Sequence, residues 1–316
     1  MNTSHFLWGI GLMAALMVGC DKVELPLPEP EIIVVNDSVY VGVNDSVTFP
    51  TVDTAAMNRD YRMTYVEEFT GHKCITCPAN TALLLQQIEE NKERMIAVSV
   101  HAGGFAEVDL PKYPTDFNTE YGTQVFQHYN MAPQPIPSAI INRRSFGNFD
   151  SLIIFNQATT FWEGPIDEEN TNTSTDFAIG LEADYIDSLD LFYIKVSTEV
   201  LNDVDGEFRL LVLCVEDSVI AEQLDARADP SEHPDKIVKD YVHRHVLRKK
   251  LNPDQSLGGD PLISGAVSVG TWFDYELNAT MPENVVNKEK THIIAVLTNV
   301  DTEEVMQSIE VHTHVK

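Results

Sequence analysis

Basic residues are scarce in this chain of 316 residues. Lysine and arginine together number 21, against 49 aspartate and glutamate residues, so the formal net charge is −28. A surface with this charge repels nucleic acid and the anionic headgroups of lipids. The composition therefore argues against a nucleic-acid-binding function, and no nucleic acid partner is expected.

Apolar stretches long enough to cross a membrane are also lacking. The apolar run at residues 6–18 is too short to span a bilayer and is typical of the core of a signal peptide. It is followed by Cys20, in a stretch similar to a bacterial lipobox. We therefore predict that residues 1–20 are a lipoprotein signal peptide and that lipid on Cys20, palmitate included, attaches the chain to a membrane. An uncleaved anchor or a buried cysteine is the alternative.

Cysteine is scarce as well, with four residues in the chain. Cys20 is the predicted lipid site, and Cys214 lies in the apolar run 209–215, which is typical of a buried strand. A thiol buried in this way is expected to be an inert core residue. The other two, Cys74 and Cys77, lie three positions apart, and outside the cytoplasm such a pair is by default a disulfide.

The pair Cys74 and Cys77 stands where a predicted strand, residues 63–69, turns into a predicted helix, residues 79–94. This arrangement is typical of a thioredoxin-type dithiol. The first sulfur would lie at the helix N-terminus, where unpaired N–H groups and the helix dipole favour a thiolate.

Two residues before the pair, His72 and Lys73, are expected to add positive charge on the same side. The alternative for the pair is a zinc half-site or a small structural staple. Zinc usually needs a second Cys or His pair at similar spacing, and none is nearby in the sequence. We therefore expect no metal and no cofactor.

The order of the predicted elements extends the similarity to thioredoxins. The helix is followed by the apolar run 95–101, typical of a buried parallel strand, and later by Ile136-Pro137 before another apolar strand. A closing helix is expected at residues 152–162. We predict an α/β thioredoxin-like N-terminal domain over residues 61–164.

The segments on either side of this domain have other patterns. Residues 21–60 contain a proline-rich tether and an alternation typical of a small β-hairpin. Residues 165–316 contain predicted strands, one of them at 263–277, without helices between them, which indicates an all-β antiparallel sandwich domain. Within it, residues 219–262 are charged and contain proline, and we predict a long insertion there, a loop that is either functional or mobile.

Glu68 lies six residues before Cys74, at the end of the predicted strand. In thioredoxins a buried carboxylate at this spacing assists proton transfer at the second cysteine, so the resemblance makes Glu68 the candidate general base for Cys77. A solvent-facing side chain is the alternative, because the alternation of a strand does not tell whether Glu67 or Glu68 points inward.

Pro137 is the candidate cis-proline. It would place the backbone of Ile136 beside the sulfurs, ready to pair with an extended peptide. An ordinary trans proline that opens an edge strand is the alternative. In a redox-active protein Cys74 would attack and Cys77 would resolve, with Glu68 as proton shuttle.

Two His-x-His pairs would each place two imidazoles on one face of a strand, His243 with His245 and His312 with His314. No Cys, Asp or Glu completes either set, so we expect ordinary surface or loop histidines rather than a metal site. The basic run at residues 248–250 is expected to be a solvated patch.

The pattern Asp-Ser/Thr-aliphatic recurs more often than the composition predicts. It is the acceptor pattern of the O-glycosylation known in Bacteroidota envelopes. We hypothesise that Ser38, Ser46 and Thr54, which lie near the tether, carry glycans. The alternative is that Asp-Ser favours turns.

Three stretches together resemble one family of proteins, the outer membrane protein twenty-eight lipoproteins of Bacteroidota. They are residues 65–78 around the dithiol, residues 240–248, and residues 293–299 with 304–307. The resemblance implies a lipid-anchored cell-envelope protein with a thioredoxin-like domain and a β-rich C-terminal domain. It implies no particular substrate.

Two functions follow from these observations. We favour a binding or interaction lipoprotein of the outer membrane, facing the periplasm or the surface, with a protein or peptide partner. The alternative is an envelope thiol–disulfide oxidoreductase that uses Cys74 and Cys77, so enzymatic activity stays open.

Overall fold

The computed structural model describes residues 32–35, 47–91, 93–132, 134–147, 152–155 and 162–316. The predicted signal peptide, Cys20, Ser38, Ser46 and most of the tether lie outside the described residues. In the part of the chain that is described, no helix combines the length and hydropathy of a membrane span.

The chain is rich in β-structure, and its strands form mixed sheets. The α-helices are α1 (Cys77–Glu90), α2 (Glu120–His128) and α3 (Glu163–Asn170). The strands are, in chain order, β1 (Ile32–Val35), β2 (Thr64–Thr70), β3 (Met95–His101), β4 (Ser138–Ile141), β5 (Ile154–Phe155), β6 (Phe177–Ile186), β7 (Leu191–Val200), β8 (Val204–Glu216), β9 (Val219–Leu224), β10 (Ile237–His243), β11 (Val246–Lys250), β12 (Asp260–Val267), β13 (Trp272–Thr280), β14 (Thr291–Asn299), β15 (Val305–His312) and β16 (His314–Val315).

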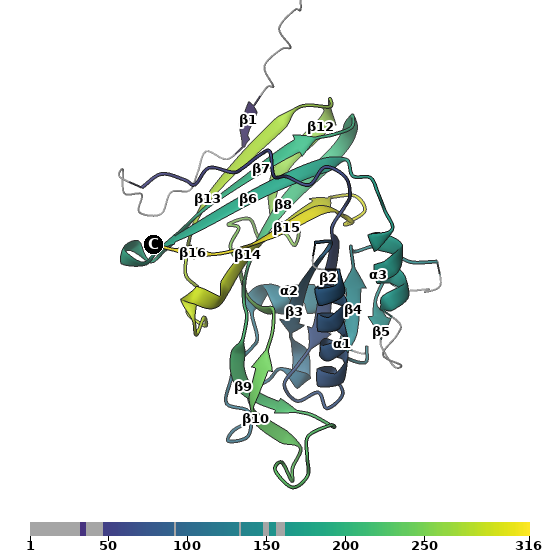
Figure 1. Ribbon diagram of the computed structural model, residues 1–316, viewed down its shortest axis with the longest axis vertical. Helices are drawn as coiled ribbons and strands as arrows, with labels where there is room; N and C mark the ends of the chain where they lie inside the picture. Colours follow the sequence, from purple (N-terminus) through teal and green to yellow (C-terminus); the bar gives the residue numbers. More distant parts are fainter. Residues whose placement is uncertain (1–31, 36–46, 92, 133, 148–151, 156–161) are drawn as a thin grey trace, which may run out of the picture.

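A nine-stranded sheet forms the middle of the molecule, in the order β15-β14-β8-β11-β3-β2-β4-β5, with β12 also paired to β8 (Figure 1). A second, five-stranded sheet has the order β1-β13-β7-β6-β16. The strands β9 and β10 form a separate two-stranded hairpin, which lies beside α1 at the end of the molecule away from the five-stranded sheet (Figure 1).

The second half of the central strand β8, from Leu210 on, is buried on both of its faces, which explains the continuous apolar sequence there. Successive side chains of a strand point to opposite faces. Leu210, Val212 and Cys214 therefore belong to the core shared with the five-stranded sheet. Their neighbours Leu211 and Leu213 belong to the core shared with α2. The buried position predicted for Cys214 is confirmed.

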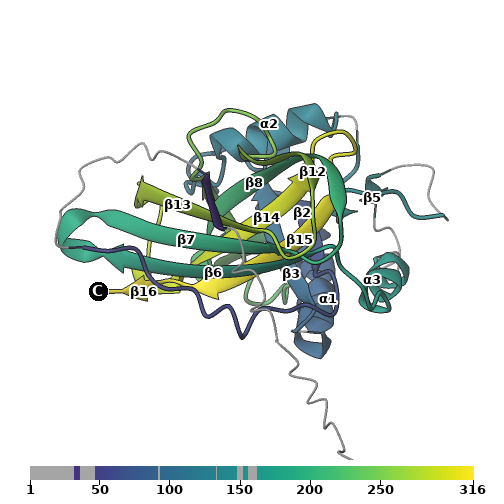
Figure 2. The same cartoon turned by 90° about the horizontal axis from the view of Figure 1, so that it is seen from above.

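The helices cover both faces of the other end of the large sheet. Helix α2 lies on one face, and α1 and α3 lie on the other (Figure 2). Val125 of α2 packs with Tyr65 and Val98, whereas Leu84 of α1 and Ile166 of α3 pack in a separate cluster. The strands β2 and β3 are consequently buried along their whole length.

Residues 219–262 are not a loop, and this prediction was wrong. They contain the hairpin β9–β10, the strand β11 and the start of β12. The adjacent charged residues Lys239 and Asp240 of β10 are both exposed, because the pairing with β9 is irregular between Val238 and Tyr241, while Ile237 and His243 are buried. A hairpin that packs on the fold with one face can carry charged residues elsewhere. These charges obscured the alternation of apolar and polar residues in the sequence.

Two further element predictions need correction. Residues 263–277 are not one strand, because Gly270, with φ 82°, allows the turn between β12 and β13. The helix expected at 152–162 begins later, at Glu163, where Pro165 fits in the first turn. Ile154–Phe155 instead forms the strand β5 beside β4.

The large sheet crosses the boundary that the sequence predicts between residues 61–164 and 165–316. Strand β11 pairs in parallel with β3 on one side and antiparallel with β8 on the other. Backbone hydrogen bonds therefore run without interruption from one predicted domain into the other.

Candidate functional site

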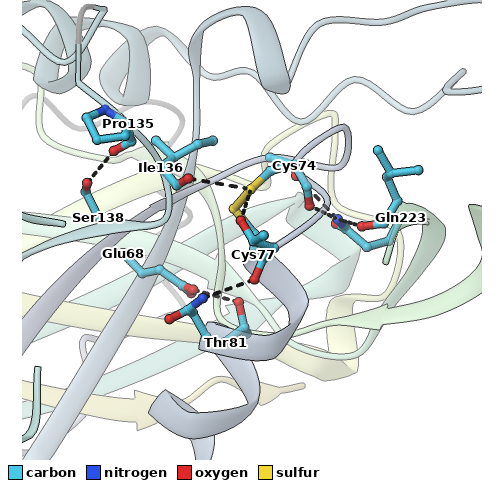
Figure 3. The surroundings of a disulfide bond; sticks show 12 residues. Glu68, Cys74, Cys77, Thr81, Pro135, Ile136, Ser138 and Gln223 are labelled. Carbon is cyan, nitrogen blue, oxygen red and sulfur yellow. Dashed lines mark hydrogen bonds between the residues drawn. A yellow bond between two sulfur atoms is a disulfide. The ribbon is translucent and has the colours of Figure 1, made fainter. Parts of the chain in front are cut away.

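The cysteines Cys74 and Cys77 form a disulfide at the N-terminus of α1, with an S–S distance of 2.06 Å (Figure 3). Thr76 is the N-cap residue, and Pro78 stands in the first turn, where a missing N–H is tolerated. Both cysteines are buried, with 3% of Cys74 and 1% of Cys77 exposed, whereas Ile75 between them is 43% exposed. A partner therefore meets the side chain of Ile75 before it meets the sulfurs.

The loop before β4 faces the disulfide. The Ile136–Pro137 peptide bond is cis, as predicted. The carbonyl oxygen of Ile136 lies 4.0 Å from Cys74 Sγ, and the Ser138 hydroxyl donates to the Pro135 carbonyl at 2.5 Å (Figure 3). The backbone of the half-buried Ile136 thus stands next to the sulfur that was predicted to attack.

Glu68 is fully buried on β2 and points toward the first turns of α1 (Figure 3). The Thr81 hydroxyl donates to one carboxyl oxygen at 2.6 Å, and the Ser99 hydroxyl donates to the other at 3.0 Å. Burial outweighs these two hydrogen bonds and raises the pKa of Glu68 to about 7. A carboxyl group with this pKa can both accept and release a proton near neutral pH.

Glu67 is buried as well, but on the opposite face of β2. The guanidinium of Arg143 donates two hydrogen bonds to its carboxylate, at 2.7 and 2.8 Å, and a third to the Tyr121 hydroxyl. Glu67 thus has a basic partner, whereas the side-chain partners of Glu68 among the described residues are two hydroxyl groups. Both glutamates point inward, which is an outcome that the sequence alternatives did not include.

His72 does not supply the positive charge that was expected of it. The residue is fully buried against Tyr113 and Phe117, and desolvation lowers its pKa. Its Nε2 lies 3.0 Å from the Glu107 carbonyl oxygen. Lys73 Nζ lies 3.9 Å from the Glu107 carboxylate, so Lys73 and not His72 is the basic residue of the expected pair.

The C-terminal half contacts the loop of residues 71–76 between β2 and α1, the dithiol loop. The sequence did not predict these contacts. The side-chain amide of Gln223 on β9 donates to the Cys74 carbonyl at 3.0 Å (Figure 3). The backbone N–H of Leu224 donates to the His72 carbonyl, and that of Ala226 donates to the Ile75 carbonyl. A signal was available: Gln223 is a polar residue at a position where the alternation of β9 demands a buried side chain.

The His243–His245 pair does not share one face of a strand. His243 ends β10 and is buried beside Phe117 and His101, at ring-centroid distances of 4.6 and 5.5 Å. His245 follows with a positive φ of 51°, outside the strand. Similarly, His312 ends β15 and His314 begins β16. Within the described part of the chain no group of three or more His, Cys, Asp or Glu could hold a metal.

Residues 248–250 are not a solvated patch throughout. The Arg248 side chain is buried and its Nε donates to the equally buried Glu216 carboxylate at 2.8 Å. Glu216 also accepts hydrogen bonds from the backbone N–H groups of Val286 and Asn287. Among the candidate glycosylation residues, Thr54 lies in the described part and is exposed.

A family model described as outer membrane protein Omp28 matches residues 123–315 of the chain. No curated protein matches it. Among solved structures, HBP35 of Porphyromonas gingivalis is similar, with a TM-score of 0.57 and 15% identity, over 80% of this chain and 76% of that one. A domain of the outer membrane lipoprotein Omp28 from the same organism matches with a TM-score of 0.30 and 17% identity, over 45% of this chain and 91% of the domain. The likeness to HBP35 concerns the fold alone.

Proposed function

Because this chain belongs to the outer membrane protein Omp28 family and is therefore a protein of the cell envelope, we propose that its dithiol exchanges disulfides with protein partners at the outer membrane. The observation that carries this proposal is the buried carboxyl group of Glu68, held by the hydroxyls of Thr81 and Ser99 beside the helix that bears Cys77. A purely structural disulfide does not need such a group.

We treat residues 61–164 as a thioredoxin-like unit and residues 165–316 as a sandwich-type unit. The order β2, dithiol, α1, β3, β4, β5, α3 supports the first assignment, with β3 parallel and β4 antiparallel to β2. The core between the five-stranded sheet and β8, β12 and β14 supports the second.

In the exchange, the thiolate of Cys74 attacks a partner disulfide, forms a mixed disulfide and releases one partner thiolate. Cys77 then gives its proton to Glu68, and the resulting thiolate attacks Cys74 Sγ. The bond between Cys74 and the partner breaks, and the second partner sulfur leaves as a thiolate that takes up a proton. The partner gains two electrons and the Cys74–Cys77 pair loses them; the reverse sequence oxidises a partner dithiol.

The Ile136 carbonyl beside Cys74 supports a role for the cis-proline loop in holding the partner backbone during this exchange. The exposed Ile75 gives an apolar contact next to the sulfurs. Both features suit an extended peptide rather than a small polar molecule.

The proposal is tested by trapping with a synthetic peptide that contains one disulfide. Reduced Cys77→Ser protein should form a stable mixed disulfide with the peptide through Cys74, visible by intact mass. The double variant Cys74→Ser/Cys77→Ser, which keeps Cys214, is the matched control and should form none. If the single variant traps no peptide and the reduced wild-type protein does not accelerate its reduction, disulfide exchange is ruled out.

A binding function is the second candidate, and one feature of the β9–β10 hairpin favours it. Ile220 and Val242 are cross-strand neighbours and are 68% and 45% exposed. Exposed apolar pairs of this kind are typical of contact surfaces. Ile220→Lys/Val242→Lys should abolish co-purification of an envelope partner, without changing peptide trapping by Cys74; unchanged co-purification would count against this surface.

We also propose that Cys20 carries the lipid anchor and that Ser38, Ser46 and Thr54 carry glycans. The exposure of Thr54 is compatible with modification. The intact mass of protein from its native host measures both: a mass equal to that of the unmodified mature polypeptide would rule them out.

A further inference from the structure

A small polar cavity lies behind the dithiol, at the place where the two halves of the chain meet. Its lining includes Thr81, Ser99, His101, Tyr241, His243 and Arg244. The first three belong to α1 and β3, and the others belong to β10 or directly follow it. The cavity is therefore built jointly by the thioredoxin-like unit and the hairpin.

The two residues that donate side-chain hydrogen bonds to Glu68 also line the cavity. Thr81 and Ser99 both line it, and both donate a hydroxyl hydrogen bond to the Glu68 carboxyl group. A hydroxyl group can accept a proton on one side while it passes its own proton on. A single hydroxyl group, that of Thr81 or of Ser99, thus stands between the cavity and Glu68, the proposed general base.

The size of the cavity matches one water molecule. The space open to the centre of a water-sized sphere is about 10 Å³. A buried water needs roughly this volume and about two to four polar partners. The hydroxyl oxygens of Thr81 and Ser99, which already donate to Glu68, can accept from a water, and so can the buried Nε2 of His243, which has no hydrogen-bond partner among the described residues. A water donates two hydrogen bonds, so it can bond Nε2 and one of the two hydroxyls at the same time.

The surroundings of His243 keep its ring neutral. The charged and titratable groups that act on it are His72 of the dithiol loop, His101 of β3 and Arg248 of β11, and the backbone of Glu222 on β9 lies within hydrogen-bonding reach. Burial is the largest influence and lowers its pKa to about 3. A neutral imidazole can accept a hydrogen bond from water without capturing the proton that passes.

We propose that this cavity is a buried water site through which the proton of Glu68 exchanges with solvent, and that His243 positions the water through Nε2. The partly exposed Tyr241 and Arg244 form the outer side of the route. As a step of catalysis the route rests on the proposed disulfide exchange. The exchange of the Glu68 proton itself does not depend on that function.

The experiment is a rapid pH jump across the pKa of Glu68, followed by infrared detection of its protonated carboxyl band in the full oxidised protein. Glu68→Gln identifies the band by its loss. His243→Phe, which lacks an acceptor, should slow the protonation of Glu68 by roughly tenfold or more. His243→Gln, which keeps an acceptor oxygen, should restore most of the rate. His128→Gln, at an exposed position, is the control and should behave as the wild type.

An unchanged rate in His243→Phe would overturn the proposal, and so would equal slowing in His243→Phe and His243→Gln. If His243→Phe does not fold, Ser99→Ala provides the same test, because it removes one of the two hydroxyls between Glu68 and the cavity. If Cys77→Ser traps no peptide and the reduced wild-type protein does not accelerate its reduction, disulfide exchange is refuted and this result stays intact, so the two proposals fail separately.

Discussion

At the scale of single residues, β2 carries two neighbouring glutamates with opposite electrostatic surroundings. Glu67 is paired with the guanidinium of Arg143 at 2.7 Å, and both side chains are buried. Glu68 has two hydroxyl donors and no cation among the groups that act on its pKa. Burial therefore favours the neutral form of Glu68 and makes it the group on the strand that can exchange protons near neutral pH.

A raised pKa makes Glu68 a source of instability at neutral and higher pH. The folded protein keeps the proton up to about pH 7, whereas the unfolded chain releases it near the usual pKa of 4.5. The stabilisation is complete below about pH 4.5 and is lost as the pH rises to about 7. Glu68→Gln should therefore increase the free energy of unfolding at high pH by about 2–3 kcal/mol.

Urea denaturation of wild type and Glu68→Gln, from about pH 4.5 to pH 8, measures this difference. Burial lowers the pKa of His243, so its effect on the free energy of unfolding has the opposite sign: its stabilisation is lost as the pH falls below about 6.5. This effect is the same in wild type and Glu68→Gln and does not change the difference between them.

Glu67→Gln is the matched control. It should destabilise the protein across the whole range, by roughly 3–5 kcal/mol, because it leaves Arg143 buried without its counter-ion. A loss of stability in Glu68→Gln at high pH would contradict the assignment.

At the scale of secondary structure, the β9–β10 hairpin supports the dithiol loop. Gln223 donates to the Cys74 carbonyl, and two backbone N–H groups of the hairpin region donate to the same loop. These bonds join segments that are about 150 positions apart, since Cys74 and Gln223 are separated by 149 residues. The conformation of the loop before α1 thus depends on a hairpin of the C-terminal half.

Gln223→Ala should loosen this contact. The carbonyl of Cys74 would lose its buried donor, at a cost of about 1–3 kcal/mol. We expect faster amide hydrogen exchange in residues 71–75 and 219–226, measured by mass spectrometry. Gln255→Ala, at an exposed position, should leave both segments unchanged. Equal exchange in the two variants would show that the hairpin does not hold the loop.

At the scale of the whole molecule, the two predicted domains share their largest sheet and a polar seam. The Arg62 guanidinium contacts Glu169 of α3 at 2.8 Å and Glu304, just before β15, at 2.6 Å. The side chain of Gln307 on β15 accepts from the Met63 N–H and donates to the Phe177 carbonyl. Such a boundary couples the two halves rather than separating them.

The protein should consequently unfold in one cooperative transition. Trp162 is buried near α1, and Cys214 is buried in β8, so they report on different halves. In a urea series, the fluorescence of Trp162 (in a Trp8→Phe/Trp272→Phe background) and the labelling of Cys214, read by peptide mass spectrometry, should give the same midpoint. Arg62→Ala should lower both midpoints together. Separate midpoints would mean that the halves fold independently.

Much of the local structure could be read from the chain. The strand before Cys74, the helix after Cys77 and the buried strand around Cys214 were predicted, because each depends on neighbours within a few positions. The Ile136–Pro137 cis bond was predicted from the thioredoxin-like order of the elements around it. Periodicity, turn residues and caps are local signals of this kind. The hairpin at 219–243 was missed because its charged residues obscured the alternation of apolar and polar residues.

The chemistry of the site depends on contacts that no local pattern records. The raised pKa of Glu68 follows from its burial, which outweighs the hydrogen bonds from Thr81 and Ser99. Arg143 pairs with Glu67 on the opposite face of β2. Gln223 reaches the Cys74 carbonyl, and His243 reaches the cavity that Thr81 and Ser99 also line, in a fold where β11 pairs with both β8 and β3 and so joins the halves. Local dihedral preferences act over a few residues, whereas burial and charge depend on every chain segment that folding brings within a few ångströms, and sequence distance says nothing about those.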